Sequence, residues 1–211
     1  ERLEPLRAAP QPAALVGLPG NSEGIDAFDL DFAAAGELMV QRMHDLGHRE
    51  LILVSQPEHV VERGGAYVWR LANAAAARAS ELGVQLHHYY AASSQPAIGA
   101  DLNAFLDAHP GATGLLLNNE AAAAALPNVL QSRSLTVPAE MSVIGRYSET
   151  FARTFSLPYS AIDSAPDLLG RRAVEHLVSR IDGTAGADTH VVDLIAPIID
   201  DRGSLAAPPR K

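Results

Sequence analysis

The strongest constraint on the fold is the stretch 46–54, where a helical pattern stops and a buried strand begins a few residues later. Apolar residues recur at helical spacing up to Leu46, and Gly47 stands where a helix commonly ends in a left-handed residue. The run from Leu51 to Val54 is apolar at every position and too short for a helix, as in a strand covered on both faces. A helix followed closely by such a strand is the repeating unit of an α/β fold.

The same alternation continues along most of the chain. Helical spacing of apolar residues predicts helices over about 31–46, 65–82, 100–109, 120–133 and 164–183. Short segments of strand character predict strands at 13–18, 51–54, 84–90, 113–117, 141–144, 160–162 and 191–195, and alternating apolar and acidic residues predict another at 25–30. Strands that alternate with helices of this length need right-handed crossovers, so we predict an α/β fold built from parallel sheets.

Composition excludes several classes of protein. Sixteen Lys and Arg against 25 Asp and Glu give a formal net charge of −9, which argues against these residues holding a nucleic-acid backbone, because that needs clustered cations. There is no cysteine, so disulfides and thiol catalysis are excluded. The longest apolar run, Ala121 to Pro127, is far shorter than a membrane span. We expect a soluble protein with no membrane partner, and a start at Glu1 without methionine indicates a fragment or a processed product.

No catalytic or metal-binding constellation can be assembled from the sequence. The glycines of the stretch 17–24 do not fit a dinucleotide-binding fingerprint, and neither a P-loop nor a nucleophile elbow occurs. His44 and His48 stand four residues apart, as metal ligands on a helix do, but Gly47 is expected to end that helix and no acidic third ligand is placed. We therefore expect no enzyme, no cofactor and no metal site.

Several short motifs occur in the order and spacing of one known family. They are Asp29-Leu30-Asp31 with Gly36, Leu46-Gly47-His48-Arg49, Arg63 with Tyr67, Asn119-Glu120, the run from Val137 to Gly145, Pro158 to Ile162, Gly170, and Arg202-Gly203-Ser204. Each motif alone is weak, but together they span nearly the whole chain. The sequence resembles the effector-binding core of the LacI/GalR family of bacterial transcription regulators, which has the periplasmic-binding-protein-like type I fold.

This resemblance implies two parallel-sheet, Rossmann-like subdomains with a ligand cleft between them. By the family's topology we assign 1–56 and 163–187 to the N-subdomain, and 57–162 and 188–211 to the C-subdomain. Family members carry a helix-turn-helix, a hinge helix and opening strands ahead of this region. We therefore expect the DNA-binding part to be absent from this chain and the N-subdomain to be incomplete.

The resemblance also implies a function. The chain would be the small-molecule sensor and dimerisation domain of a cytoplasmic repressor, with a sugar or sugar derivative as effector, a second copy as partner, and operator DNA contacted only through the absent N-terminal part. The alternative is a periplasmic solute-binding protein of the same fold that serves a sugar transporter. An upstream helix-turn-helix would favour the first function, and a secretory signal the second.

Some of the candidate ligand-binding residues follow predicted strands. Arg63 lies in a predicted loop, and the planar set of N–H donors on its guanidinium suits ligand hydroxyls or a carboxylate. The alternative is that Arg63 is exposed and pairs with Glu62. Asn119 suits a sugar hydroxyl, but Asn is also a preferred helix N-cap, and both roles can hold together. Glu120 stands where the family usually has Asp, and is equally a first-turn helix acid. Tyr90 and its neighbour would offer a stacking face, although aromatic residues in strands more often belong to the core.

The stretch 146–148 departs from the family pattern. Arg146-Tyr147-Ser148 stands where the family usually shows an aromatic residue and two Asp. Tyr147 offers a flat apolar face in place of a carboxylate, whereas Arg146 adds a cation that favours an acidic or phosphorylated group. We therefore predict a ligand other than a plain neutral hexose. The alternative is that Arg146 points to solvent and Tyr147 only fills space.

Overall fold

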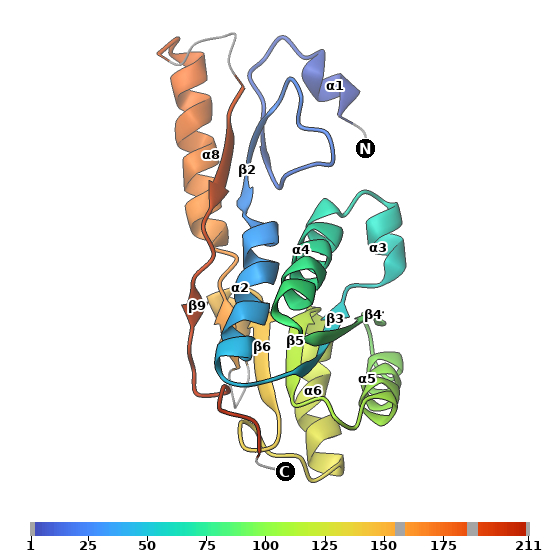
Figure 1. Cartoon of the computed structure of the whole chain (residues 1–211). Helices are drawn as coiled ribbons and strands as arrows, with labels where there is room; N and C mark the ends of the chain where they lie inside the picture. Colours follow the sequence, from blue (N-terminus) through green and yellow to red (C-terminus); the bar gives the residue numbers. More distant parts are fainter. Residues whose placement is uncertain (1–2, 155–158, 185–189, 210–211) are drawn as a thin grey trace.

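The computed structural model describes residues 3–154, 159–184 and 190–209, and within them it contains two sheets (Figure 1). The larger sheet has six strands in the order β4-β3-β5-β6-β7-β9, and the smaller has three in the order β1-β2-β8. Neighbouring strands run parallel in both sheets, except β7 and β9. The predicted α/β fold with parallel sheets is therefore confirmed.

Most elements lie within a few residues of their predicted positions. The strands of the larger sheet are β3 (Glu50–Ser55), β4 (Gln85–Tyr90), β5 (Gly114–Asn118), β6 (Ser142–Arg146), β7 (Ser160–Ile162) and β9 (Ile199–Asp200). The helices around this sheet are α2 (Phe32–Asp45), α3 (Glu58–Glu62), α4 (Ala66–Leu82), α5 (Ala97–Ala108), α6 (Glu120–Ser132) and α7 (Glu149–Ala152). The smaller sheet has the strands β1 (Ala14–Val16), β2 (Asp26–Leu30) and β8 (Val192–Ile195), accompanied by the helices α1 (Glu4–Arg7) and α8 (Pro166–Ile181).

Two short elements lie where only loop was predicted, namely α3 within 55–64 and β9 near the end of the chain. The short helix α7 lies between Arg146 and Tyr159, where the sequence suggests a loop with one short helix. Residues 155–158 of this stretch, including Pro158, lie outside the described residues. In the described part of the chain, no helix combines the length and the apolar character that crossing a membrane requires.

The larger sheet is buried on both faces because its central strands are apolar at nearly every position. Leu51, Leu53 and Leu116 point to the face covered by α2 and α4. Ile52 and Leu115 point to the opposite face, which α5 and α6 cover. These five side chains are at most 1 % exposed. Each contributes roughly 1.5–3 kcal/mol through burial, so this sheet forms the stable part of the molecule.

The helix α2 begins and ends as its sequence predicts. The Asp31 side chain accepts a hydrogen bond from the Ala34 N–H at 2.9 Å, and Gly47 adopts a φ of +103° beyond the last turn. In its middle, Gly36 lets α4 approach closely, since an added Cβ would lie 2.2 Å from the carbonyl oxygen of Leu71. The joint at 46–54 thus connects a tightly packed helix to the first strand of the larger sheet.

The division into subdomains differs from the predicted one. Residues 32–55, assigned to the N-subdomain, belong with the larger sheet, because β3 pairs with β4 and β5 and α2 packs on its face. Residues 192–195, assigned to the C-subdomain, pair with β2 in the smaller sheet. The predicted boundary at residue 56 is therefore wrong, and the chain first crosses near Asp31. Below, the small body means α1, β1, β2, α8 and β8, and the large body means all other elements.

The helix α8 covers one face of the smaller sheet. Leu169 and Ala173 are both 5 % exposed and pack with Phe28. Val178 and Ile181, at the helical spacing that predicts this helix, are instead 49 % and 70 % exposed. The small body therefore buries much less apolar surface than the large one.

Candidate functional site

The two bodies meet at a group of polar and aromatic residues near the carboxyl ends of the parallel strands. We call it the Arg146 cluster, and its members are Asp29 of β2, Phe32 of α2, Tyr67 of α4, Asn118 of β5, Glu120 of α6 and Arg146 of β6. In open α/β sheets, ligands bind at this end of the strands. The cluster is therefore the candidate binding site.

Arg146 is the central residue of the cluster and is only 8 % exposed. Its guanidinium carbon lies 5.6 Å from the ring centre of Phe32 and 5.8 Å from that of Tyr67. Its Nε donates a hydrogen bond of 3.0 Å to Asn118 Oδ1. Within the described residues, no carboxylate lies within ion-pair distance of Arg146, and its terminal nitrogens make no hydrogen bond. Arg146 is therefore buried within the cluster, and the alternative in which it points to solvent is wrong.

The electrostatics of Arg146 follow from this burial. Desolvation lowers the pKa of Arg146, while the nearby Glu120, Tyr67 and Asp29 act in the opposite direction. The guanidinium nevertheless stays charged, since its ordinary pKa lies far above neutral pH. The site therefore holds a positive charge in a poorly hydrated position, which attracts anions.

Asn118 adds a second unpaired donor. Its side chain is fully buried, and its Nδ2 has no hydrogen-bond partner among the described residues, although its Oδ1 accepts from Arg146. A buried amide N–H without a partner costs about 1–3 kcal/mol. Asn118 and Arg146 therefore present donors whose pairing would lower the free energy of the site.

Asp29 is the contribution of the small body to the cluster, and its oxygens are already used. Oδ2 accepts from the Leu18 N–H at 2.7 Å, and Oδ1 accepts from the Leu30 N–H at 2.9 Å. Burial raises the pKa of Asp29, while these two N–H groups and the charges of Arg70 and Arg146 oppose the rise. Asp29 therefore orders the loop after β1 and supplies negative charge close to Arg146.

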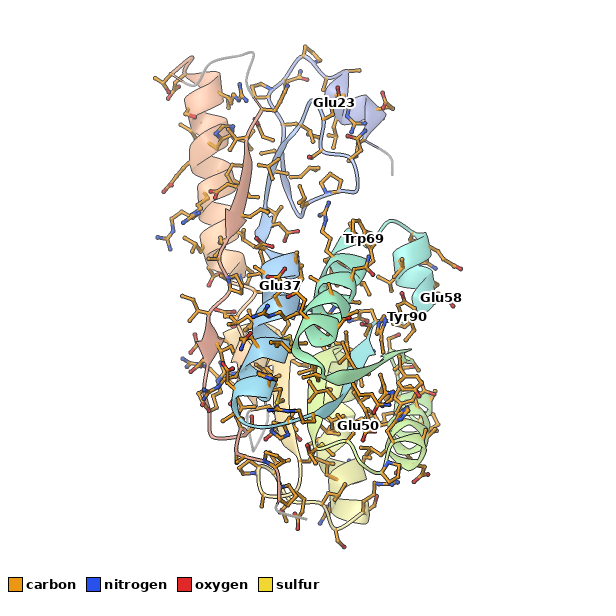
Figure 2. The ribbon with its side chains drawn as sticks, in the orientation of Figure 1. Glu23, Glu37, Glu50, Glu58, Trp69 and Tyr90 are labelled. Atoms are coloured by element: carbon orange, nitrogen blue, oxygen red, sulfur yellow. The ribbon has the colours of Figure 1, made fainter. Side chains whose placement is uncertain are left out.

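Arg70 of α4 connects the two bodies directly. Its Nη1 donates to the carbonyl oxygen of Leu18 and its Nη2 to that of Pro19, each at 2.7 Å. Trp69, 38 % exposed, precedes it at the end of α4 that faces the small body, and its ring centre lies 5.2 Å from the Arg70 guanidinium carbon (Figure 2). The loop that Asp29 orders is thus also held by the large body.

Of the six predicted ligand residues, the structure brings Arg146 and Glu120 into the cluster. Asn119 lies beside it, 1 % exposed, with its amide fully used. Its Oδ1 accepts from the Ala122 N–H at 3.1 Å, and its Nδ2 donates to the carbonyl oxygen of Ser55 at 3.1 Å. The helix-cap alternative for Asn119 is therefore confirmed, and the residue ties the start of α6 to the end of β3.

Tyr147 belongs to the core rather than to the cluster. Only 1 % of it is exposed, and its hydroxyl donates to the carbonyl oxygen of Tyr159 at 3.2 Å. Burial raises the pKa of the Tyr147 phenol far above its ordinary value. Successive residues of an extended chain point to opposite faces, so Tyr147 turns away when Arg146 faces the cluster. The prediction that Tyr147 faces the ligand is therefore wrong, and its space-filling alternative holds.

The remaining two candidates lie on the outside of the large body. Tyr90 is 40 % exposed at the end of β4, with its ring 4.8 Å from that of His88 (Figure 2). Arg63 is exposed at the end of α3, and no hydrogen bond or ion pair joins its side chain to another described residue. The structure does not place either residue in the Arg146 cluster.

Four cluster members escaped the sequence prediction as ligand residues, namely Asp29, Phe32, Tyr67 and Asn118. A usable signal existed for Asn118, since it directly follows an apolar run and starts the pair Asn118-Asn119. His48, weighed as a metal ligand, is instead buried and uses both ring nitrogens. Its Nδ1 lies 2.7 Å from Thr113 Oγ1, and its Nε2 lies 3.0 Å from the carbonyl oxygen of Ala206.

Residues 40–205 match the sequence family described as the periplasmic binding protein-like domain. The chain belongs to this family. A curated relative, the HTH-type transcriptional regulator CelR of Thermobifida fusca, is 24 % identical over 168 residues, which make up 80 % of this chain and 48 % of the relative. The chain therefore spans about half the length of the curated relative that it matches.

Solved structures of LacI family regulators have the same fold. One from Enterococcus faecium with bound ribose has a TM-score of 0.77 at 20 % identity, over 93 % of this chain and 71 % of that chain. A complex of the transcriptional regulator CelR with cellobiose has a TM-score of 0.70 at 20 % identity, over 89 % of this chain and 56 % of that chain. These matches confirm the predicted periplasmic-binding-protein-like fold and the resemblance to effector-binding cores of LacI family regulators.

Proposed function

We propose that this chain is the effector-sensing part of a bacterial transcription regulator, and that its effector is a small acidic molecule, with a sugar acid as the best fit. The family membership supports ligand binding between two bodies. Relatives that are regulators, one with ribose and one with cellobiose bound, support a ligand of sugar size. The alternative of a solute-binding protein for a transporter has no support in these relatives.

The observation that carries the acidic ligand is the buried Arg146 without an ion-pair partner. A charge removed from water is costly unless an opposite charge or several acceptors compensate it. A ligand carboxylate can accept two parallel hydrogen bonds from a guanidinium. An oxygen of the same ligand would accept from the buried Asn118 Nδ2 once the two bodies part enough to expose that atom. Bound there, the ligand would compensate both residues at once.

Other residues would recognise the neutral part of such a ligand. Glu120, half-buried beside Arg146, can accept hydrogen bonds from hydroxyl groups, and the rings of Phe32 and Tyr67 offer apolar faces to a sugar ring. Arg63 and Tyr90 lie further out and are proposed as contacts at the rim. A molecule with both a carboxylate and hydroxyls uses the whole cluster, whereas a plain hexose leaves the cation uncompensated.

Sensing would act through the two bodies. A ligand held by Arg146 on one side and by the loop near Asp29 on the other favours the closed arrangement that Arg70 already supports. Closure would bias the DNA-binding part of a cytoplasmic regulator, which lies outside these 211 residues. The net charge of −9 supports a chain that does not itself hold DNA. A regulator of a symmetric operator would act as a homodimer.

The test is isothermal titration calorimetry of the unaltered chain with matched pairs of acidic and neutral sugars, such as galacturonate with galactose and glucuronate with glucose. We expect an acidic sugar to bind more tightly than its neutral counterpart. In Arg146→Met, the affinity for that acid should fall by about 30-fold or more, since a charge-assisted hydrogen bond contributes about 1.5–3 kcal/mol. The affinity of Arg146→Lys should lie between those of the unaltered chain and Arg146→Met, because lysine keeps the positive charge but cannot donate two parallel hydrogen bonds.

The matched control is Arg153→Met, an exposed arginine whose partner is Glu149. It removes one exposed positive charge that belongs to no cluster interaction and should leave the affinity unchanged. Circular dichroism checks that each variant folds. Tight binding of a neutral hexose without preference for its acid, or equal affinities in the unaltered chain and Arg146→Met, would contradict the proposal.

A further inference from the structure

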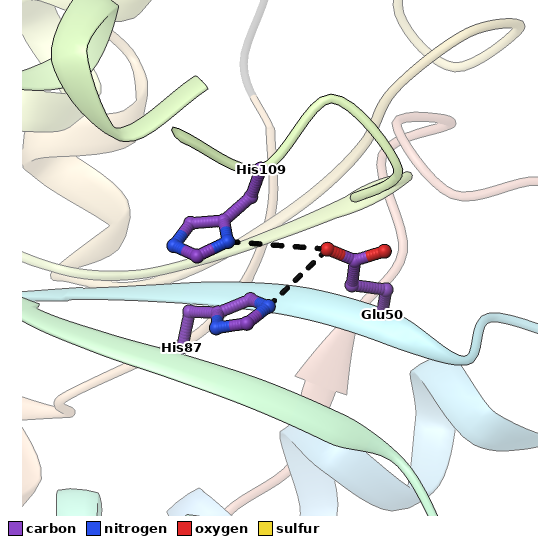
Figure 3. Close-up of side chains that lie close together, drawn as sticks. All are labelled: Glu50, His87 and His109. Carbon is purple, nitrogen blue, oxygen red and sulfur yellow. Dashed lines mark hydrogen bonds and ion pairs between the residues drawn. The ribbon is translucent and has the colours of Figure 1, made fainter. Parts of the chain in front are cut away.

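A second group of polar side chains lies at the opposite end of the larger sheet. Glu50 is the first residue of β3, His87 lies on the neighbouring strand β4, and His109 ends α5 (Figure 3). The strand β3 runs from Glu50 to Ser55, so this group lies roughly 16 Å from the strand ends near the Arg146 cluster, at about 3.3 Å per residue. The two groups are therefore separate sites.

The three side chains each bring one potential ligand atom close to the other two. His87 Nε2 lies 3.2 Å from Glu50 Oε1, and His109 Nδ1 lies 4.0 Å from the same oxygen (Figure 3). One ligand atom from each residue lies within 4.8 Å of the other two. A tetrahedral zinc ion with bonds of about 2.0–2.2 Å holds its ligand atoms roughly 3.3–3.5 Å apart. The two imidazoles, now stacked, would rotate about their side-chain bonds to bring both nitrogens and the carboxylate to that geometry.

The surroundings suit a bound ion. The His109 Nε2 lies 2.5 Å from the Tyr89 hydroxyl, so the outer ring nitrogen already has the hydrogen-bond partner that orients a metal-binding histidine. At Gly111 an added Cβ would lie 2.2 Å from Glu50 Oε2, so a larger residue would displace the carboxylate. The rings of His87 and His109 stack with centroids 3.4 Å apart at 13°, so both lie near Glu50, and one ion bound in the plane of each ring would require this stack to open.

The group also has the accessibility that a metal site needs. Side-chain exposure is 17 % for His87, 26 % for Glu50 and 17 % for His109, so an ion can enter while the side chains stay ordered by their neighbours. Two imidazoles and a carboxylate suit zinc and similar transition metals, whereas calcium and magnesium prefer oxygen ligands alone. A fourth position on the exposed side remains for water.

We propose that Glu50, His87 and His109 form a binding site for one divalent transition-metal ion, with zinc as the best fit. The ion would join three segments that are far apart in sequence, namely the start of β3, the edge strand β4 and the end of α5. Because it binds only the folded chain, it should raise the thermal midpoint of unfolding. The site is independent of the effector site proposed above.

The experiment titrates the chain, prepared without a histidine tag and treated with a chelator, with zinc chloride in a calorimeter. We expect one equivalent of zinc per chain and a higher unfolding temperature with zinc. His87→Ala and Glu50→Gln should each weaken zinc binding by at least tenfold. The matched control, His59→Ala, removes a single exposed histidine on α3 and should bind like the unaltered chain.

A second variant keeps the test valid if His87→Ala or Glu50→Gln fails to fold. Gly111→Ala keeps all three ligands and should still weaken zinc binding, because the added methyl displaces the Glu50 carboxylate. Cobalt(II) provides an independent signal, since tetrahedral coordination gives visible absorption that His87→Ala should abolish. If the unaltered chain shows no saturable zinc binding, or if His87→Ala and His59→Ala bind zinc equally, the proposal is wrong and the group is only a hydrogen-bonded surface cluster.

Discussion

At the scale of single residues, two neighbouring asparagines at the end of β5 have opposite roles. Asn119 satisfies its whole amide by capping α6 and by donating to the end of β3. Asn118 is just as deeply buried, yet its Nδ2 has no partner in the described part of the chain. Asn119 therefore stabilises the fold. Asn118 instead has an amide N–H that lost its water on burial without gaining a partner, and a hydrogen bond to a ligand oxygen would remove this cost.

His48 provides a prediction at this scale that concerns stability and pH. Burial lowers its pKa, and both ring nitrogens are used by Thr113 and Ala206 in a neutral ring. When the pH falls below the ordinary histidine pKa of about 6.5, His48 binds a proton in the unfolded chain but stays neutral in the folded chain. The contribution of His48 to stability is therefore present above that pH and is lost as the pH falls.

We expect the free energy of unfolding, measured by urea titration, to fall between about pH 7 and pH 5.5. His48→Gln should make this dependence shallower while lowering stability at neutral pH. Burial also lowers the pKa of His88, so some dependence should persist in the variant. Identical pH dependences for the unaltered chain and His48→Gln would contradict the assignment.

The residue scale is also where prediction from sequence was weakest. The sequence pointed to Asn119, Glu120 and Arg146 but missed Asn118, because which asparagine keeps an unpaired amide depends on the face that each side chain takes. Tyr147 was misplaced for the same reason, since a shift of one residue moves a side chain from the cluster to the core. Asp29 and Tyr67 come from other segments, and only the fold brings them to Arg146.

At the scale of elements, the crossing of α2 and α4 depends on Gly36. An added Cβ would lie 2.2 Å from the Leu71 oxygen and 3.0 Å from the Ala75 nitrogen, and both atoms belong to the backbone. Gly36→Ala should therefore force the helices apart and destabilise the chain by about 1–3 kcal/mol, despite a gain of roughly 1 kcal/mol in helix propensity.

The control for Gly36→Ala is Gly170→Ala in α8. An added Cβ at Gly170 meets nothing within 4 Å, so only the propensity gain remains, and stability should rise by about 0.5–1 kcal/mol. Urea titration of both variants measures the difference. If Gly36→Ala were as stable as Gly170→Ala, the close helix contact would not limit the packing.

Elements were predicted best, because helical spacing and short apolar runs are local properties of the sequence. The helix bounds at 31–46, 65–82 and 120–133 agree closely with α2, α4 and α6. What the local pattern could not decide is which sheet each strand joins. Both β2 and β3 lie in stretches predicted as short strands, yet β2 pairs with β1 and β8, whereas β3 pairs with β4 and β5.

At the scale of the whole molecule, the two bodies differ in how completely they are covered. The larger sheet has helices on both faces, whereas α8 covers one face of the smaller sheet (Figure 1). Most of the exposed large apolar side chains in the described residues lie on the small body or next to its strand β8, namely Leu6, Val16, Val174, Val178, Ile181, Val191, Val192 and Leu194. Apolar surface concentrated in this way favours association.

We therefore expect this chain to self-associate through its small body, as a homodimeric regulator would. Sedimentation equilibrium over a range of concentrations should show a mass that rises toward that of the dimer. The double variant Val178→Glu, Ile181→Glu places two negative charges on one exposed face of α8 and should shift the equilibrium to monomer. Tyr90→Glu, which adds a charge at an exposed aromatic residue of the large body, serves as the control and should leave the dimer intact. A chain that stays monomeric at every concentration, or a double variant that dimerises like the control, would contradict association through this surface.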